Sequence, residues 1–229
     1  MISINKINKS YQNRQILKDV SLNANKNDII CILGKTGQGK TTLFNIISNI
    51  EVIDSGTITN SYEHRDIEFV FQEDTLLPWR TVKENILLNL ELKFIELDDS
   101  YYSKILNELQ LNGYEDYFPY KLSGGTKRKV SIARSLICKP KLLILDEPFN
   151  GLDFIVKSEI ENLLKELTKN NDIEIILYSS HLLESSIVFA TKLFVLNIDE
   201  GLKELNIENS LKESITNNIK NLRDLEIYK

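Results

Sequence analysis

Apolar and polar positions alternate in different ways along the chain. In the first seventy residues, short strand-type runs are separated by turn signals. Residues 2–7 alternate apolar with polar side chains, residues 29–33 are apolar throughout, and residues 67–71 form a further strand-type run. Apolar residues recur at helical spacing from 40 to about 49. The pattern therefore predicts several strands interrupted by one helix.

The pattern becomes helical from about residue 81 to residue 136. Helices are expected from residue 82, at 99–109 and at 124–137. Strand-type runs then return at 141–145, 173–178 and 193–197, and a helix over 154–170 separates the first two. Strands that alternate with helices favour right-handed βαβ units and a parallel sheet. The helical block is expected to be inserted between two parts of an α/β core.

The end of the chain has a helical pattern of its own. Ser210 and Glu213 have the spacing of a capping box, and an apolar stripe follows them. We therefore expect one domain over residues 1–229. Residues 1–80 and 138–200 would form its α/β core, 81–137 a helical subdomain, and 201–229 a helical tail for which only a packing role is expected.

Composition narrows the class of protein. The net charge is −5, whereas proteins that bind nucleic-acid backbones usually carry a basic excess. Two cysteines, Cys31 and Cys138, are too few for a disulfide-rich fold or a tetrahedral zinc site, which fits a reducing compartment. No window approaches the roughly 18–20 apolar residues of a membrane-spanning helix, and no secretion signal is visible. Composition alone thus predicts a cytosolic protein with no membrane contact.

A glycine-rich loop follows the apolar run at 29–33. It matches the pattern G-x-x-x-x-G-K-[ST], in which backbone N–H groups and the start of the next helix cradle phosphates. Lys40 is expected to reach the β- and γ-phosphates and Thr41 to ligate Mg²⁺. A chance turn is the alternative. The nucleotide-binding candidates are Gly34, Lys35, Thr36, Gly37, Gln38, Gly39, Lys40, Thr41 and Thr42.

Two acids end the apolar run before residue 146. Asp146 would lie at the carboxyl end of a buried strand, where parallel-sheet folds place their ligand sites, and is expected to hold Mg²⁺. Glu147 would then face the space beyond the γ-phosphate, where a general base acts on water. The alternative is a pair of solvated acids that merely end a strand.

A short motif, Leu122-Ser123-Gly124-Gly125, precedes a predicted helix about twenty residues before the two acids. Alone it could be an ordinary helix N-cap. Together with the other two motifs, however, it makes the chain resemble the ATPase subunit of an ABC transporter, from residue 2 to about 197. The resemblance implies a P-loop ATPase core with a mostly parallel sheet, an antiparallel N-terminal β part and an inserted helical subdomain. It also implies ATP and Mg²⁺ as ligands.

In that family, Ser123, Gly124 and Gly125 would contact the γ-phosphate bound by a second subunit, so the resemblance implies an ATP-dependent homodimer. The resemblance further assigns Tyr11 to stacking on adenine, although an isolated tyrosine more often packs. It assigns Gln72 to Mg²⁺ or the attacking water, and Asp153 to the dimer interface. Finally, His181 would bond the γ-phosphate and orient the attacking water, on which Glu147 acts as general base.

Three positions depart from the family pattern. Thr126 stands where Gln or Met is usual, Leu182 replaces a common Asp, and Asn150-Gly151 replaces Ser-Ala or Gly-Ala. None of these changes removes a group that handles phosphate, Mg²⁺ or water. Activity is therefore expected, with altered contacts between the subunits.

The stretch Leu76-Leu77-Pro78-Trp79, followed by Thr81-Val82, is similar to the nitrate, sulfonate and taurine group of ABC importers, which includes transporters of thiamin-pyrimidine precursors. The alternative buries Trp79 against the helical subdomain. The similarity implies a separate permease that docks near Gln72–Arg80, and an extracellular or periplasmic solute-binding protein. The chain would then lie on the cytoplasmic face of the membrane, which revises the expectation from composition.

Other members of the family provide two alternatives. One is an ATPase for export or lipoprotein release, which is not expected to carry the Leu-Leu-Pro-Trp loop. The other is a soluble assembly-type ATPase, which the length of the chain does not exclude. Translation factors need two cassettes and repair ATPases need long coiled coils, so 229 residues leave room for neither.

Overall fold

The computed structural model describes residues 1–206. The described strands are β1 (Ile2–Tyr11), β2 (Arg14–Ala24), β3 (Asp28–Leu33), β4 (Ser55–Asn60), β5 (Ile67–Val70), β6 (Leu142–Leu145), β7 (Ile175–Ser180), β8 (Lys192–Asn197) and β9 (Gly201–Leu205). The described helices are α1 (Lys40–Ile47), α2 (Val82–Lys93), α3 (Asp99–Glu108), α4 (Gly124–Leu136), α5 (Phe154–Lys169) and α6 (Leu183–Phe189), with short 3₁₀ turns η1 (His64–Asp66) and η2 (Pro119–Lys121).

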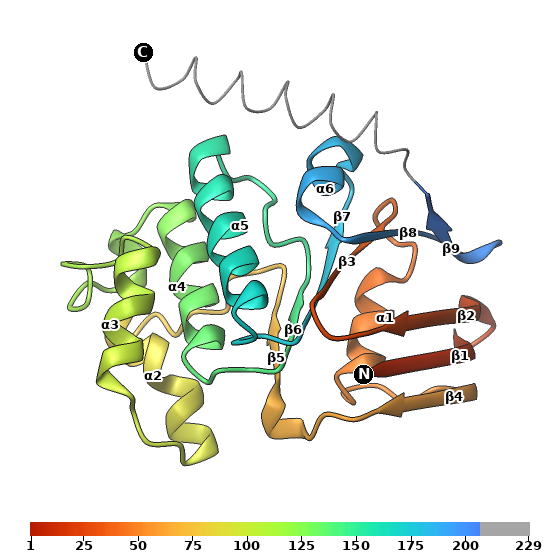
Figure 1. The fold of residues 1–229 in the computed structure, drawn as a ribbon, viewed down its shortest axis with the longest axis horizontal. Coiled ribbons are helices and arrows are strands. Elements are labelled where there is room, and N and C mark those ends of the chain that lie inside the picture. Colours follow the sequence, from red (N-terminus) through yellow and green to blue (C-terminus); the bar gives the residue numbers. More distant parts are fainter. Residues whose placement is uncertain (207–229) are drawn as a thin grey trace.

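The strands form two sheets. The larger has the order β5-β6-β7-β3-β8-β9, in which every neighbouring pair is parallel except β8 and β9. The smaller is antiparallel, with the order β2-β1-β4. Figure 1 shows the helices α2, α3 and α4 at one end of the molecule and the antiparallel sheet at the other. This arrangement confirms the predicted α/β fold with a mostly parallel sheet and an antiparallel N-terminal part.

The large sheet is buried on both faces, which explains its uninterrupted apolar runs. In β3, Ile30 and Ile32 belong to a core shared with α1 and the antiparallel sheet. Ile29, Cys31 and Leu33 point the other way, into a core shared with the helices α2 to α6. The two-residue period of a strand distributes these side chains between the two faces. The sheet is therefore held rigidly between two hydrophobic cores.

The carboxyl ends of four adjacent parallel strands meet at one edge of this sheet. Gly34 follows β3, Gln72 lies two residues beyond β5, Asp146 follows β6, and His181 follows β7. The Gly34 N–H donates to the carbonyl of Ser180 at 3.3 Å, which links the ends of two strands. An open α/β sheet binds its ligands at this edge.

Asparagine and threonine side chains fix the start of α2. Thr81 and Glu84 form a capping box, with bonds of 3.3 Å and 2.7 Å between side chains and backbone N–H groups. The buried amide of Asn85 donates to the carbonyls of Leu77, Arg80 and Thr81. The loop before α2 is therefore held by the first turn of the helix.

The structure corrects three expectations about secondary structure. The strand β2 and the helix α6 were not predicted. The expected helical tail is wrong for Gly201–Leu205, which pairs antiparallel with β8 as β9. Gly201 has a φ of 75°, and a Cβ there would lie 2.6 Å from the carbonyl oxygen of Lys18, so a glycine permits this tight hairpin. The predicted capping box at Ser210 lies outside the described residues.

Cys31 is buried in the fold, and Cys138 is partly buried. Burial raises the pKa of Cys31 to about 11 and that of Cys138 to about 12. Within residues 1–206, no helix has the length and apolar character needed to cross a membrane.

Candidate active site

The loop between β3 and α1 is shaped by two glycines. A Cβ at Gly39, where φ is 91°, would lie 2.9 Å from Ile16 Cγ2 and 3.0 Å from Leu17 Cδ2. A Cβ at Gly34 would lie 2.9 Å from the carbonyl oxygen of Leu196. The loop is thus pressed against its surroundings on both sides, and a side chain at either glycine would force it open.

The loop leads directly into α1, whose first N–H groups have no side-chain cap. Such N–H groups, with the positive end of the helix dipole, attract phosphate. The Lys40 ammonium lies inside the loop, where it donates to the carbonyls of Gly34 at 2.7 Å and Lys35 at 3.1 Å. Its Nζ is also 3.3 Å from Glu147 Oε1. A buried cation and free N–H donors therefore converge on one point.

The Thr41 hydroxyl and the Asp146 carboxylate meet beside this loop. Thr41 Oγ1 donates to Asp146 Oδ2 at 2.6 Å, and the hydroxyl of Ser179 donates to the other carboxylate oxygen at 2.5 Å. Oxygen ligands of this kind suit Mg²⁺, which usually takes one or two protein groups together with substrate phosphates. Within the described residues no group of three or more His, Cys, Asp or Glu could hold a metal. The residues present fit Mg²⁺ bound together with a phosphate ligand.

Glu147 has an unusual backbone conformation. Its φ is 43°, in the left-handed region, and its N–H donates to Ser179 Oγ at 2.7 Å. Its other carboxylate oxygen lies 3.9 Å from His181 Nδ1 and accepts a bond of 3.4 Å from Asn150. Residues other than glycine adopt this conformation at a cost, and such strain is concentrated at functional sites. Here it places the carboxylate between Lys40 and His181.

Two cavities meet at Glu147. One, of about 190 Å³, is lined by residues of the glycine loop, by Ile16 and by Gln72. The other, of about 120 Å³, is lined by His181 and by residues that follow Glu147. The structure therefore brings together the predicted loop, the two acids, Gln72 and His181.

The other predicted site residues lie apart from these cavities. Ser123 is exposed and caps α4, accepting a bond from the Thr126 N–H at 3.1 Å. Asp153 caps α5 in the same way through Val156. Tyr11 is 44% exposed and lies over the ammonium of Lys9, 5.2 Å from the ring centroid.

Within the loop itself, Gln38 has a structural partner. Its side-chain oxygen accepts the N–H of Ile198 at 2.9 Å, which ties the loop to the β8–β9 turn. Thr36 and Thr42 line the 190 Å³ cavity, together with Gly37. Lys35 is exposed. The nine predicted residues thus divide into those that face the cavity and those that shape the loop.

Sequence reasoning missed three residues around the site. Ser179 connects Asp146 to the backbone of Glu147, and its place at the end of a predicted strand could have revealed it. Ile16 lines the cavity from β2, which was not predicted. Arg128 donates to the main-chain carbonyl of Asp146 from within α4, and no local pattern distinguishes it from a solvated arginine.

The loop before α2 also resolves the alternatives for the single tryptophan. Trp79 is 71% exposed, so the alternative in which it packs against the helical block is wrong. A large exposed apolar side chain of this kind is typical of an interaction surface.

The sequence pattern of the ABC transporter family matches residues 17–150 of the chain. An aliphatic sulfonates import ATP-binding protein of Agrobacterium fabrum is 34% identical over 205 residues, covering 87% of this chain and 77% of the relative. The chain belongs to the ABC transporter family. Subunits of this family that bind ATP are ATPases, and this ABC chain is therefore an ATPase.

Two further comparisons extend this assignment of the ABC chain. A taurine import ATP-binding protein of Yersinia pestis is also 34% identical, covering 88% of this chain and 81% of the relative. A dimeric ATP-binding cassette, solved in a post-hydrolysis state with ADP and Pi, has a TM-score of 0.77 and 27% identity. That alignment covers 91% of this chain and all of the solved chain.

Proposed function

We propose that this chain is the ATP-hydrolysing subunit of an importer for a small solute, which it energises through a separate membrane permease. The observation that carries the proposal is the convergence of Lys40, Thr41, Asp146 and Glu147 at one edge of the sheet. The similar proteins described as importing sulfonates and taurine support a solute of that kind. Nitrate and thiamin-pyrimidine precursors stay within the same proposal, because the ATPase does not touch the solute.

Substrate ATP would bind with its phosphates in the glycine loop. The uncapped start of α1 and the Lys40 ammonium supply donors and positive charge there. Thr41, Asp146 and Gln72 would hold Mg²⁺, which offsets negative charge on the phosphates. Tyr11 would stack on the adenine ring. The loop glycines keep this cradle close to the backbone, as the near contacts at Gly39 indicate.

Hydrolysis requires a base beside the γ-phosphate, and Glu147 is positioned for it. Its carboxylate would take a proton from water while the water oxygen attacks the γ-phosphorus. The bond from that phosphorus to the bridging oxygen breaks, and ADP leaves with the released electron pair. His181, 3.9 Å from the carboxylate, would orient the water, and Lys40 would stabilise the charge that develops.

A second copy of the chain would complete each site. Ser123 and Gly124 are exposed at the start of α4, and a Cβ at Gly124 would meet no atom within 4 Å. This helix start can therefore approach the γ-phosphate bound by another chain, with Asp153 contributing to the interface. The dimeric state of the solved cassette with ADP and Pi supports this arrangement. Hydrolysis would remove the phosphate that joins the halves.

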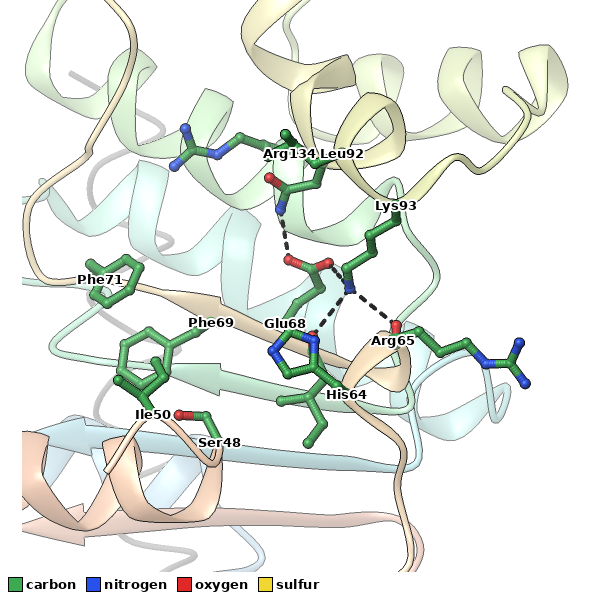
Figure 2. A pocket seen from close by; sticks show the side chains of 12 residues that line it. Ser48, Ile50, His64, Arg65, Glu68, Phe69, Phe71, Leu92, Lys93 and Arg134 are labelled. Atoms are coloured by element: carbon green, nitrogen blue, oxygen red, sulfur yellow. Dashed lines mark hydrogen bonds and ion pairs between the residues drawn. The ribbon is translucent and has the colours of Figure 1, made fainter. Parts of the chain in front are cut away.

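The permease would dock along the segment Gln72–Arg80 and in the groove beside it. Figure 2 shows this groove, of about 710 Å³, with Phe69 and Phe71 on one side and Leu92 on the other. The ring centroids of the two phenylalanines are 4.5 Å apart. Phe71 directly precedes Gln72, so a segment seated here would press on the loop that enters the active site.

Charge and exposure in this groove favour an apolar segment of the permease. Among the described residues that line the groove, the one carboxylate, Glu68, is paired with Lys93 at 2.6 Å and with the Asn89 amide at 2.7 Å. The two lining arginines are also engaged, since Arg65 pairs with Glu63 and Arg134 donates to the carbonyl of Thr75. Beyond the groove, Phe94 is 96% exposed and Trp79 is 71% exposed, as is typical of an interaction surface. Docking would hold the chain on the cytoplasmic face of the membrane. A solute-binding protein on the other side would deliver the solute to the permease.

Glu147→Gln tests the proposal. Removing a general base typically costs 10²- to 10⁴-fold, so we expect the rate of phosphate release to fall by about 10³. With its base removed, the variant should accumulate an ATP-bound dimer, detected by size-exclusion chromatography with light scattering. Glu159→Gln, which alters an α5 carboxylate paired with Lys129, is the matched control. A wild-type chain without ATPase activity, or a Glu147→Gln chain with full activity, would overturn the proposal.

The solute and the permease require a separate measurement. The chain should co-purify with a polytopic membrane protein. The variant Trp79→Ala should recover less of this membrane protein, because the substitution removes an exposed apolar side chain from the docking segment. Recovery of soluble partners alone would instead favour an assembly-type ATPase.

A further inference from the structure

Helix α4 carries a buried guanidinium at a junction of three segments. Arg128 Nη1 donates to the carbonyl of Phe71 at 2.6 Å, and Nε donates to the carbonyl of Pro148 at 2.8 Å. Nη2 donates to the carbonyl of Asp146 at 3.1 Å. Only 4% of the residue is exposed. One side chain thus joins the helical block to the loop after β5 and to the turn after β6.

The same guanidinium reaches further along the loop after β5. Its Nη1 lies 3.4 Å from the carbonyl of Gln72 and 3.5 Å from Asp74 Oδ1. Partial burial raises the pKa of Asp74, and the charge of Arg128 opposes that rise. A guanidinium presents five donors in a fixed planar fork, so it can hold the carbonyls of Phe71, Asp146 and Pro148 at once. The compact ammonium of a lysine does not reproduce that fork.

The two segments that Arg128 joins have distinct places in the proposed function. Phe71 lines the groove of Figure 2, and Gln72 lines the cavity of the glycine loop. On the other side, Asp146 and Pro148 flank Glu147, whose left-handed backbone directs the carboxylate. Hydrogen bonds to carbonyls on both sides of Glu147 fix the main chain on which that direction depends.

We propose that Arg128 is a positioning residue, which fixes the main chain around Glu147 relative to the main chain of Gln72. A displacement of the loop beside the groove would then be transmitted to Glu147 through the Arg128 side chain. This inference rests on the proposed function, since it assumes that Glu147 activates water. Arg128 does not touch the nucleotide in this arrangement, and it acts through the residues that do.

A control substitution at the next residue distinguishes a positioning role of Arg128 from a purely stabilising one. Lys129 lies next along α4, is 7% exposed, and forms an ion pair of 2.8 Å with Glu159 of α5. It is therefore a buried cation on the same helix. Within residues 1–206 its ammonium pairs with Glu159 and not with the loop after β5 or the turn after β6. Lys129→Gln removes a buried charge pair and leaves the junction intact.

The experiment compares Arg128→Gln, Arg128→Lys and Lys129→Gln by steady-state ATPase kinetics and by thermal unfolding. For Arg128→Gln we expect kcat to fall about 100-fold, the cost typical of a misplacement of about 1 Å, with the KM for ATP unchanged. Arg128→Lys should fall less, by about tenfold, because it keeps the charge but not the fork. Lys129→Gln should lower the unfolding temperature and leave kcat unchanged.

Two results would overturn the inference. One is a kcat for Arg128→Gln that falls no further than that of Lys129→Gln. The other is a rise in the KM for ATP as large, in fold-change, as the fall in kcat, which indicates general damage to the site. If Arg128→Gln does not fold, Arg128→Lys decides by the same split between KM and kcat. An inactive wild-type chain would instead refute the proposed function, so the two failures are distinguishable.

Discussion

The chain has two glycine-containing segments that we propose contact phosphate, and they differ in how closely the chain packs around them. In the loop before α1, a Cβ added at Gly34 or at Gly39 would lie 2.9 Å from the nearest neighbouring atom. At the start of α4, a side-chain carbon at Gly124 would meet nothing within 4 Å. The first segment is packed tightly within its own chain. The second has open space around its glycine, which we expect another molecule to occupy.

The charges near the two segments differ in the same way. The Lys40 ammonium is buried and already bonded to two loop carbonyls and near Glu147. Ser123 is exposed, and within residues 1–206 its hydroxyl bonds only within its own helix turn. Both segments end in a helix start, the feature that attracts phosphate. This contrast is what the proposed function requires, since each chain would supply two halves of a site that only a second chain brings together.

Removing the charge of the packed segment should have the largest effect. Lys40→Met deletes the buried ammonium, so we expect ATP binding to be lost and phosphate release to fall by about 10²- to 10³-fold. Lys141→Met, which alters an exposed lysine paired with Asp66, is the control and should match wild type. A Lys40→Met chain that binds ATP normally would refute the assignment of this loop.

Mixing two inactive variants tests whether the segments act in different chains. Ser123→Ala should lower activity by about 10²-fold, the cost of one lost donor. In a dimer of Lys40→Met with Ser123→Ala, one composite site contains neither substitution. An equal mixture should therefore recover about a quarter of wild-type activity through random pairing. If the mixture is no more active than its components, the two segments do not combine across chains.

Alanine at each glycine compares the packing directly. Gly39→Ala should lower the free energy of unfolding by about 1–3 kcal/mol, because it adds a methyl group at positive φ against Ile16 and Leu17. Gly124→Ala should leave stability unchanged or raise it by up to about 1 kcal/mol, since alanine favours the helix. Urea unfolding measures both values. Equal destabilisation by the two substitutions would remove the contrast.

The smallest effect is expected in the helical block, far from both segments. Lys139, 2.8 Å away, and bonds from Ser100 and the Tyr101 N–H hold the pKa of Asp98 well below its usual value. Because the folded pKa is the lower one, this stabilisation is present above pH about 4 and is lost as the pH falls.

Asp98→Asn keeps a capping side chain for α3 and removes only the charge. It should therefore lower the urea midpoint slightly at pH 7, and its difference from wild type should shrink at pH 3. A difference that does not change with pH would show that the charge contributes nothing.

Only part of the fold that produces this contrast could be predicted from the sequence. The buried strands β3 and β6 and the helices α2 to α5 could be predicted, because apolar runs and helical spacing determine them locally. The strand β2 was missed, because its stability comes from pairing with β1 rather than from its own pattern. The helix α6 is only seven residues long, so its periodic signal is short.

The residues of the candidate site likewise differ in whether local sequence motifs reveal them. The loop residues and the two acids could be predicted from contiguous motifs whose chemistry is local. Arg128 could not, because it acts through contacts with residues distant in the sequence, and for Ser179 only its place at the end of a predicted strand was a signal. The exposure of Trp79 likewise depends on how the loop before α2 is held, which Asn85 decides by bonding carbonyls that the sequence does not mark.

The buried thiol of Cys31 and the partly buried thiol of Cys138 have a practical consequence for spectroscopy. Since burial raises the pKa of Cys31 to about 11 and of Cys138 to about 12, little thiolate forms at neutral pH, and maleimide or nitroxide reagents should attach slowly to either. A cysteine introduced at Leu92, which is 68% exposed beside the groove, would then be the fast-reacting thiol of the described chain. A probe attached there could follow occupation of the groove in a protein that keeps its native cysteines.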